Sequence, residues 1–248
     1  MFEFASKNAN VYIGKDVSIE PMNNIQIIDL CTYPSILSKH HINFYFPNDK
    51  PKIKLIVIKN IPSNIKSIKI FDTSSSLLFT SDDFDLKKID EGVNNWIKKY
   101  SDDNSVKPEL YFNNLFHLEK LNLKIISLSQ IIKMPENLIE LDFSYCENFT
   151  IRDGISNIPI SLKYLNCANT DIKFLNNLPY NLKHLVCSNT KINNLDNLPE
   201  SIIILECENC PNIKFLDNLP RGLKFLSFGS AQIKSINMLP PQIEFIHL

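Results

Sequence analysis

A regular pattern of hydrophobic and polar positions fills the C-terminal half of the chain. From residue 135 onward, a hydrophobic residue and a proline are followed by two variable residues and then by Leu-x-x-Leu-x-Cys-x-Asn-Thr-x-Ile. The clearest copy runs from Leu178 to Ile192. Around its second leucine, apolar and variable residues alternate, and this period of two is typical of a short strand with one buried face.

The copies follow one another at nearly constant spacing. Their first apolar residues are separated by 20, 24, 20, 20, 21 and 20 residues, and they are Leu118, Leu138, Leu162, Leu182, Ile202, Leu223 and Ile243. A weaker copy begins at Ile65. No single copy can bury its own apolar side, so we predict a repeat solenoid in which neighbouring copies stack on one another.

Each copy is expected to contribute one strand to a parallel β-sheet on the concave face, at the usual spacing of about 4.8 Å. The other half of each copy is too short for a long helix, and the proline at its end lacks an N–H group. We therefore expect extended or 3₁₀ segments on the convex face. Apolar residues there, such as Leu175, Leu195 and Leu216, would close the core.

The pattern resembles leucine-rich repeats, closely over residues 115–248 and less closely over 60–75. The Leu-Pro-x-x-Leu-x-x-Leu opening is similar to the short repeats of secreted bacterial effectors. The run from Leu219 to Gly229, with Asn157-Ile-Pro159 and Asn60-Ile-Pro62, looks like the Phe-Asn-Ile-Pro repeats of amoebae and large DNA viruses. The resemblance implies a leucine-rich repeat solenoid.

One position departs from that family. The resemblance implies an asparagine at the ninth position, where its amide would bond the loop backbone of neighbouring copies. Here the ninth residues include Thr170 and Thr190, and asparagines occupy the eighth position instead, at Asn169, Asn189 and Asn209. Buried backbone groups must be paired somewhere, so we expect the loops to be tighter or wetter than in the family.

The N-terminal half is organised differently. Residues 1–59 lack the repeat, but short apolar runs separated by Asn, Asp and Pro predict strands that form a β-rich N-terminal cap. The repeat array is predicted over 60–248, interrupted by a helical insertion at about 76–113. Apolar residues recur there at intervals of three and four, at Leu86, Ile89, Val93, Trp96, Ile97 and Tyr100.

Composition limits the possible partners. The chain of 248 residues is 44% hydrophobic and 21% charged, with a formal net charge of -1, so nothing favours nucleic acid. The first residues do not resemble a secretory signal, and no apolar run reaches the roughly 18 residues of a membrane span. We expect a cytoplasmic protein without membrane contact, in the host-cell cytoplasm if it is viral or an effector.

Reactive chemistry is sparse. Cys167, Cys187 and Cys207 recur every 20 residues in place of core hydrophobes, so we interpret them as packing residues. The Cys207-x-x-Cys210 pair has no second pair to complete a metal site. The glycines form no phosphate-binding loop, and the histidines of the array lie several coils apart. We predict no catalytic residue, no cofactor and no metal, and hence a protein that is not an enzyme.

The variable positions indicate a candidate site. The third, fifth and seventh residues of each copy should point to the concave side, and the third positions give a row of large side chains. The predicted partner-binding residues are Tyr164, His184, Ile204, Phe225 and Phe245 in that row, with Asn166, Val186 and Glu206 beside it. Exposed apolar rows of this kind often bind proteins. The alternative is that strands simply favour aromatic and β-branched residues.

Two functions from different classes follow. The first is a non-catalytic interaction module that binds a partner protein or peptide on the concave sheet. The second is a structural or adaptor component, either a subunit of an assembly or an adaptor whose N-terminal region recruits other machinery. The final stretch, Ile243 to Leu248, reads as a strand with an open edge, so we expect self-association through this edge or its burial by the rest of the chain.

Overall fold

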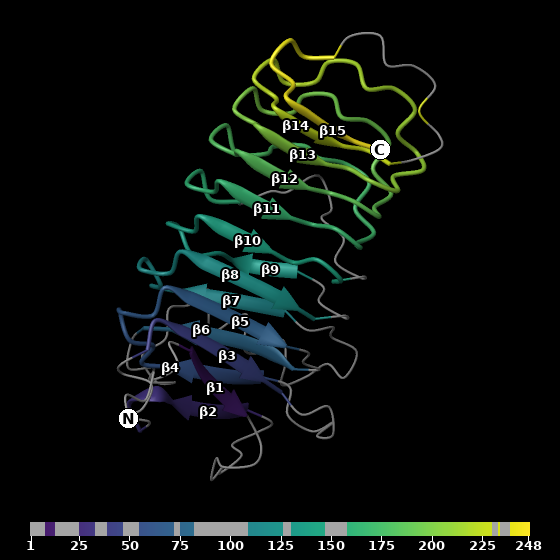
Figure 1. Ribbon diagram of the computed structural model, residues 1–248. Coiled ribbons are helices and arrows are strands. Elements are labelled where there is room, and N and C mark those ends of the chain that lie inside the picture. Colours follow the sequence, from purple (N-terminus) through teal and green to yellow (C-terminus); the bar gives the residue numbers. More distant parts are fainter. Residues whose placement is uncertain are drawn as a thin grey trace, which may run out of the picture. The chain divides into compact units, whose positions relative to one another are not determined.

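The computed structural model in Figure 1 describes residues 8–12, 25–32, 39–46, 55–71, 75–81, 109–125, 130–146, 158–229, 233 and 239–248. The chain divides into two compact units, Met1–Pro135 and Glu136–Leu248. Each unit is built from parallel strands. Among the described residues, no helix has the length and apolar composition needed to cross a bilayer.

The second unit contains one short strand per copy. These strands are β10 (Glu140–Asp142), β11 (Tyr164–Asn166), β12 (His184–Val186), β13 (Ile204–Glu206), β14 (Phe225–Ser227) and β15 (Phe245–His247). Neighbours pair in parallel with their first residues opposite one another. Every strand begins at the third residue of its copy, which confirms the repeat solenoid and its predicted register.

A turn at each proline leads into the strand. The N–H of Leu162 donates to the carbonyl of Pro159 at 3.0 Å, and Leu182 makes the same bond to Pro179 at 3.0 Å. Equivalent bonds join Ile202 to Pro199, Leu223 to Pro220 and Ile243 to Pro240. Proline fits this position because only its carbonyl is used, and its missing N–H is not needed. The turn places the first apolar residue of the copy in the core at Leu162, Leu182, Ile202 and Leu223.

Asparagine allows the sharp bend after β11, β12 and β13. Asn169, Asn189 and Asn209 have φ values of 56°, 55° and 51°, in the left-handed region where asparagine is favoured among non-glycine residues. Their backbone N–H groups donate to the next coil, as Asn189 does to the carbonyl of Glu208 at 2.8 Å. The eighth position therefore carries asparagine for its backbone conformation.

Threonine at the ninth position closes the same bend from inside the copy. The hydroxyl of Thr170 donates to the carbonyl of Cys167 at 2.6 Å, and that of Thr190 donates to Cys187 at 2.7 Å. Both hydroxyls are buried. The ninth position therefore carries threonine where the family pattern has asparagine, and the threonine hydroxyl satisfies the carbonyl three residues before it in the same copy.

The core of the second unit consists of the repeated leucines and cysteines. Leu165, Leu185 and Leu205 are fully buried, and so are Cys167 and Cys187, with Cys207 almost so. All six cysteines of the chain are free thiols. Burial raises the pKa of the Cys167 thiol well above its ordinary value, which keeps it protonated. The interpretation of these cysteines as packing residues is confirmed.

The first unit contains two parallel sheets. One contains β1 (Asn8–Tyr12), β3 (His41–Tyr45), β5 (Ser67–Phe71) and β8 (Lys120–Lys124). The other contains β2 (Ile25–Asp29), β4 (Leu55–Lys59), β6 (Ser76–Thr80), β7 (Glu109–Asn113) and β9 (Gln130–Lys133). A short 3₁₀ turn, η1, spans Leu30–Thr32. Along the chain of this unit, successive strands belong alternately to the two sheets, except that β6 and β7 follow one another in the same sheet (Figure 1).

The second of these sheets corrects two expectations. The predicted helical insertion at 76–113 is wrong at both ends, because β6 and β7 are strands that pair in parallel, with Leu77 opposite Leu110. The expected irregular segments opposite the main sheet are strands in this unit. The apolar stripe from Leu86 to Tyr100 lies outside the described residues.

The predicted cap region, residues 1–59, is rich in strands. Its β3 pairs in register with β5 of the weak copy at Ile65, with His41 opposite Ser67. Its β4 pairs with β6, with Leu55 opposite Ser76. The strands before residue 60 therefore belong to the same two sheets as those after it, and a boundary at residue 59 stays a prediction.

Candidate functional site

One face of β10–β15 carries two columns of side chains, and we call it the strand face. The middle residues of these strands, such as Leu165 and Leu185, point into the core, so the first and third residues point the other way. The first residues form the first column, and strand pairing places them directly opposite one another: Glu140, Tyr164, His184, Ile204, Phe225 and Phe245. Phe245 is 65% exposed, and the four residues before it are half-buried.

The third residues of the strands form the second column. They are Asp142, Asn166, Val186, Glu206, Ser227 and His247. The structure thus brings all eight residues of the predicted site onto one face, in two adjacent columns. Their role in binding a partner stays a prediction.

His184 links the two columns. Its Nε2 lies 2.7 Å from Oε1 of Glu206 on the next strand, and because a carboxylate only accepts, Nε2 carries the proton in this contact. The ring of His184 also packs edge-to-face against Tyr164, with centroids 4.9 Å apart and an interplanar angle of 87°. Tyr164, His184 and Glu206 therefore hold one another in fixed orientations.

Tyr164 lies among carboxylates from two other strands. Burial raises the pKa of its hydroxyl, and the negative charges of Asp142, Glu206 and Glu140 raise it further, while a hydrogen bond with Asn166 acts in the opposite direction. This part of the strand face therefore combines an aromatic ring with negative potential.

A second polar cluster lies at the far end of the face. Ser227 donates a hydrogen bond to the carboxylate of Glu208, and His247 Nδ1 lies 3.1 Å from the same carboxylate oxygen. These two contacts lower the pKa of Glu208. Ser227 Oγ also lies 3.2 Å from His247 Nδ1.

This cluster does not have the geometry of a nucleophilic triad. In such a triad the serine and the acid contact opposite nitrogens of the histidine ring. Here Ser227 and Glu208 both lie near the same Nδ1 of His247, and the serine hydroxyl donates its hydrogen bond to the Glu208 carboxylate. The arrangement holds the Glu208 carboxylate in place and gives no path for a proton through the ring. Among the described residues, no group of three or more His, Cys, Asp or Glu side chains is placed to hold a metal.

The strand face carries carboxylates and no lysine or arginine. Four carboxylates lie on or beside it, and they are Glu140, Asp142, Glu206 and Glu208. No lysine or arginine occupies the first or third position of β10–β15. Lys163, Lys183 and Lys224 each precede a strand by one residue and are exposed.

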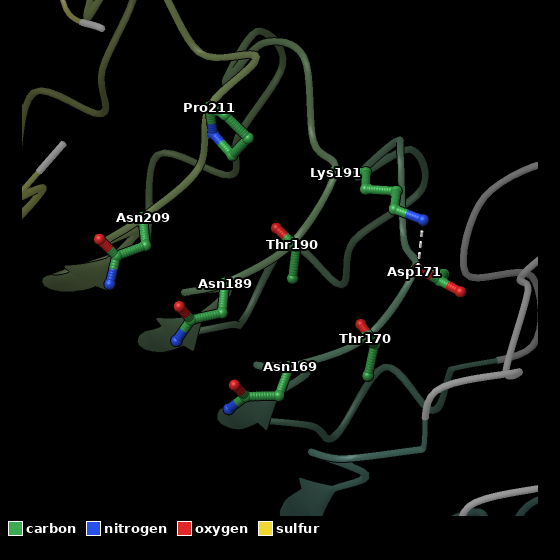
Figure 2. Close-up of a pocket in the computed structure, with 8 residues that line it drawn as sticks. All are labelled: Asn169, Thr170, Asp171, Asn189, Thr190, Lys191, Asn209 and Pro211. Atoms are coloured by element: carbon green, nitrogen blue, oxygen red, sulfur yellow. Dashed lines mark ion pairs between the residues drawn. The ribbon is translucent and has the colours of Figure 1, made fainter. Parts of the chain in front are cut away.

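A separate polar groove follows the bends after β11, β12 and β13. Figure 2 shows Asn169, Asn189 and Asn209 side by side along it, with side chains pointing the same way. Its volume is about 420 Å³, and Lys191 Nζ pairs with Asp171 at 2.6 Å on its wall. The backbone conformation described above already accounts for these asparagines, so the groove is a consequence of the repeated bend.

Comparisons with known proteins identify no family. No family model matches the sequence, and no curated protein matches it. Among solved structures, the chain is similar to YopM from Yersinia enterocolitica WA-314, with a TM-score of 0.42 and 17% sequence identity. The likeness covers 85% of this chain and 55% of YopM, so the chain spans about half the length of that protein. The assignment to a repeat solenoid rests on the strand pairing itself.

The sequence predicts the two columns of the strand face but not the side-chain contacts between them. The link from His184 to Glu206 runs diagonally, from the first column of β12 to the second column of β13. Within the first column, the strand neighbours of His184 are Tyr164 and Ile204. The available signal was the separation of 22 residues in a repeat of about 20, which places two long polar side chains on adjacent strands one pleat apart.

Proposed function

We propose that this protein is a non-catalytic interaction module that binds a partner protein or peptide on the strand face of β10–β15. The observation that carries the proposal is the in-register column from Tyr164 to Phe225. It combines aromatic, histidine and aliphatic side chains that are half-buried and so keep contact area available. Residues of this kind contribute most of the binding energy in protein interfaces. The resemblance of the repeat to leucine-rich repeats also favours a protein partner.

The face is suited to binding because its side chains are already ordered. His184 is held by Glu206 at 2.7 Å and by the ring of Tyr164, and each strand is held by parallel neighbours. Side chains that are fixed before association lose less conformational entropy when a partner binds. A rigid face with large side chains can therefore bind through a modest number of contacts.

A pair of matched variants tests the proposal. The double variant Tyr164→Ser, Phe225→Ser removes two large side chains from the strand face. The control, Phe174→Ser, Tyr180→Ser, removes two exposed aromatic side chains that follow β11 in the return segment, residues 167–183. Both variants lose similar apolar area, and only the first alters the strand face.

The measurement is the affinity of each variant for a partner isolated with the whole chain. We expect the strand-face variant to bind at least about tenfold more weakly, since loss of two anchoring aromatics removes more than one step of 1.4 kcal/mol. The control variant should bind within about twofold of the parent. Equal affinity of parent and strand-face variant, with circular dichroism unchanged, would contradict the proposal.

Self-association through β15 and a cytoplasmic location belong to the same proposal. On β15, Phe245 is 65% and Ile246 is 43% exposed in the single chain. Self-association through this strand would bury both side chains. Sedimentation velocity of the parent and of an Ile246→Lys variant, at increasing protein concentration, tests the self-association. Fractionation of cells that express the tagged chain tests the cytoplasmic location.

A further inference from the structure

A second groove lies between the segments that follow β12 and β13. Residues 193–196 of one copy and residues between 212 and 218 of the next supply its lining. Its volume is about 420 Å³, within the range of about 300–1,000 Å³ that is usual for small-molecule sites. The groove shares no residue with the strand face, so a ligand here would be independent of the partner proposed above.

The groove opens where one copy carries shorter side chains than its neighbours. At the same place in three successive copies, the sequence reads Lys173-Phe174, Asn193-Asn194 and Lys214-Phe215. Phe174 and Phe215 are 51% and 52% exposed. Asparagine reaches less far than lysine or phenylalanine, so the middle copy leaves a recess beside Phe215, whose side chain lines the groove. The recess is therefore specific to this copy.

Hydrogen bonds hold part of the polar lining in place. Asn218 Nδ2 donates to Asp196 Oδ1 at 3.3 Å, and Asn212 Nδ2 donates to the carbonyl of Lys191 at 3.1 Å, so both bonds join the two copies. Asn194 Oδ1 accepts the backbone N–H of Asp196 at 3.3 Å. The second carboxylate oxygen of Asp196 and the amide N–H groups of Asn194 are not used in these bonds, so they can serve a ligand.

The chemistry of the lining matches a sugar ring. Each hydroxyl group of a sugar both donates and accepts hydrogen bonds, and one face of a pyranose ring presents C–H groups. The carboxylates of Asp196 and Asp217 accept from hydroxyl groups, and the ammonium group of Lys214 donates to them. The exposed ring of Phe215 offers an apolar surface to the C–H face.

The mixed charges of the groove disfavour two other ligands. Asp196 and Asp217 oppose a phosphate group, whereas Lys214 opposes a divalent cation. Calcium takes about six to eight oxygen ligands, and nowhere in the described part of the chain do three or more His, Cys, Asp or Glu side chains form a metal site. A neutral ligand with many hydroxyl groups can bond to both signs of charge.

We propose that this groove binds a neutral carbohydrate. One pyranose ring packs against Phe215, and its hydroxyl groups bond to Asp196, Asp217 and Lys214. Leu195 is the buried residue of the lining, and the others are exposed. Most of the site therefore stays in contact with water, and we expect a dissociation constant on the order of 1 mM.

A titration followed by nuclear magnetic resonance tests the proposal. The probes are the methyl glycosides of glucose, mannose, galactose and N-acetylglucosamine, added separately to the isotopically labelled whole chain in the presence of EDTA. We expect at least one of them to shift the backbone amide signals of residues 193–196 and of Phe215, and the shifts should saturate. Calcium chloride, added without sugar or EDTA, tests the cation alternative.

Two variants and a matched control locate the site. Phe215→Ala removes the ring and should weaken binding of the sugar at least about fivefold. Asn194→Phe restores the pattern of the neighbouring copies and fills the recess, so it should abolish saturable binding. The control Phe174→Ala removes an equally exposed ring that does not line the groove, and it should bind within about twofold of the parent. Circular dichroism checks that each variant is folded.

Each outcome bears on the carbohydrate directly. Sugar binding that is lost in Phe215→Ala and Asn194→Phe but kept in Phe174→Ala supports the proposal. It is overturned if no glycoside gives saturable shifts, if the folded Phe215→Ala and Phe174→Ala variants bind equally well, or if only calcium chloride shifts these signals. None of these results depends on the strand face, so this proposal and the interaction module can fail separately.

Discussion

His184 and Glu206 belong to neighbouring strands and different columns, yet Nε2 of the histidine lies 2.7 Å from Oε1 of the glutamate. Their side chains are 27% and 36% exposed. A contact at this exposure is screened by water, so it contributes little to the stability of the fold. Its effect is to fix the ring that packs against Tyr164.

We expect a small coupling energy between these two residues. The single variants His184→Gln and Glu206→Gln and the double variant form a cycle, measured by urea denaturation. The coupling should be about 0.5 kcal/mol, within the range of partly exposed ion pairs. A cycle at Lys224 and Glu244, which pair at 2.7 Å with greater exposure, should give a smaller value. Coupling above about 2 kcal/mol at the first pair would show that it is a major stabilising contact.

The environment of His117, in the first unit, predicts that the stability of the folded chain depends on pH. Burial lowers its pKa below the ordinary 6.5, and the nearby positive charge of Lys66 lowers it further. Its Nε2 is buried without a hydrogen-bond partner among the described residues. The folded chain therefore disfavours the protonated ring, whereas the unfolded chain accepts the proton at the ordinary pKa.

The sign of the effect follows from proton binding. Below about pH 6.5 the unfolded chain binds a proton at His117 that the folded chain lacks, so this residue makes stability fall as the pH falls. Urea midpoints measured from pH 7.5 to 5.5 should decrease less in a His117→Gln variant than in the parent. The variant His40→Gln changes an exposed histidine and serves as the control. Identical pH slopes for parent and His117→Gln would contradict the prediction.

The six thiols should react in two distinct groups. Cys31 is exposed, and the other five are buried in the folded chain. With a thiol reagent such as Ellman's reagent, we expect one rapid equivalent in native buffer and six in denaturant. The Cys31→Ser variant should lose the rapid phase.

Cys210 provides the sharpest check on that result. Hydrogen bonding with Cys187 and Thr190 lowers the pKa of its thiol to about 6, so any access of reagent would give rapid reaction. Its sulfur is buried, with an exposed fraction of 1% for the residue. Rapid labelling at Cys210, identified by mass spectrometry, would mean that the bend after β13 opens in the native state.

The sequence predicted the strands of the second unit because each has the same period-two pattern. Leu165 and Leu185 sit between outward residues, and alternation of this kind has only one reading. The strands β4 and β6 lack it, since Leu55–Ile58 and Ser76–Thr80 are buried at every position. Continuous apolar runs are typical of parallel strands covered on both faces, and periodicity cannot separate them from other buried segments. The sequence therefore predicts a helical insertion at β6, and it predicts strands before residue 60 without the second sheet that β2 and β4 form.

The columns of the candidate site were also predictable, and the contacts within them were not. Register alone places Tyr164, His184 and Ile204 side by side. The separation of 22 residues places His184 and Glu206 on adjacent strands, but whether they touch depends on their rotamers, which the repeat length does not encode. Likewise the asparagine at the eighth position was visible in the sequence, but its φ above zero explains it only once the bend is seen.

That bend gives the last prediction. Asn189 has a φ of 55°, a conformation that costs a residue with a Cβ about 1 kcal/mol and costs glycine nothing. We expect Asn189→Ala to lower the free energy of unfolding by about 1 kcal/mol, and Asn189→Gly to lower it less. The control Asn193→Ala alters an exposed asparagine outside the left-handed region and should change stability by less than about 0.5 kcal/mol. If alanine and glycine at residue 189 gave equal losses in urea denaturation, the asparagine would be required for its amide rather than for its backbone. The row in Figure 2 would then need a different explanation.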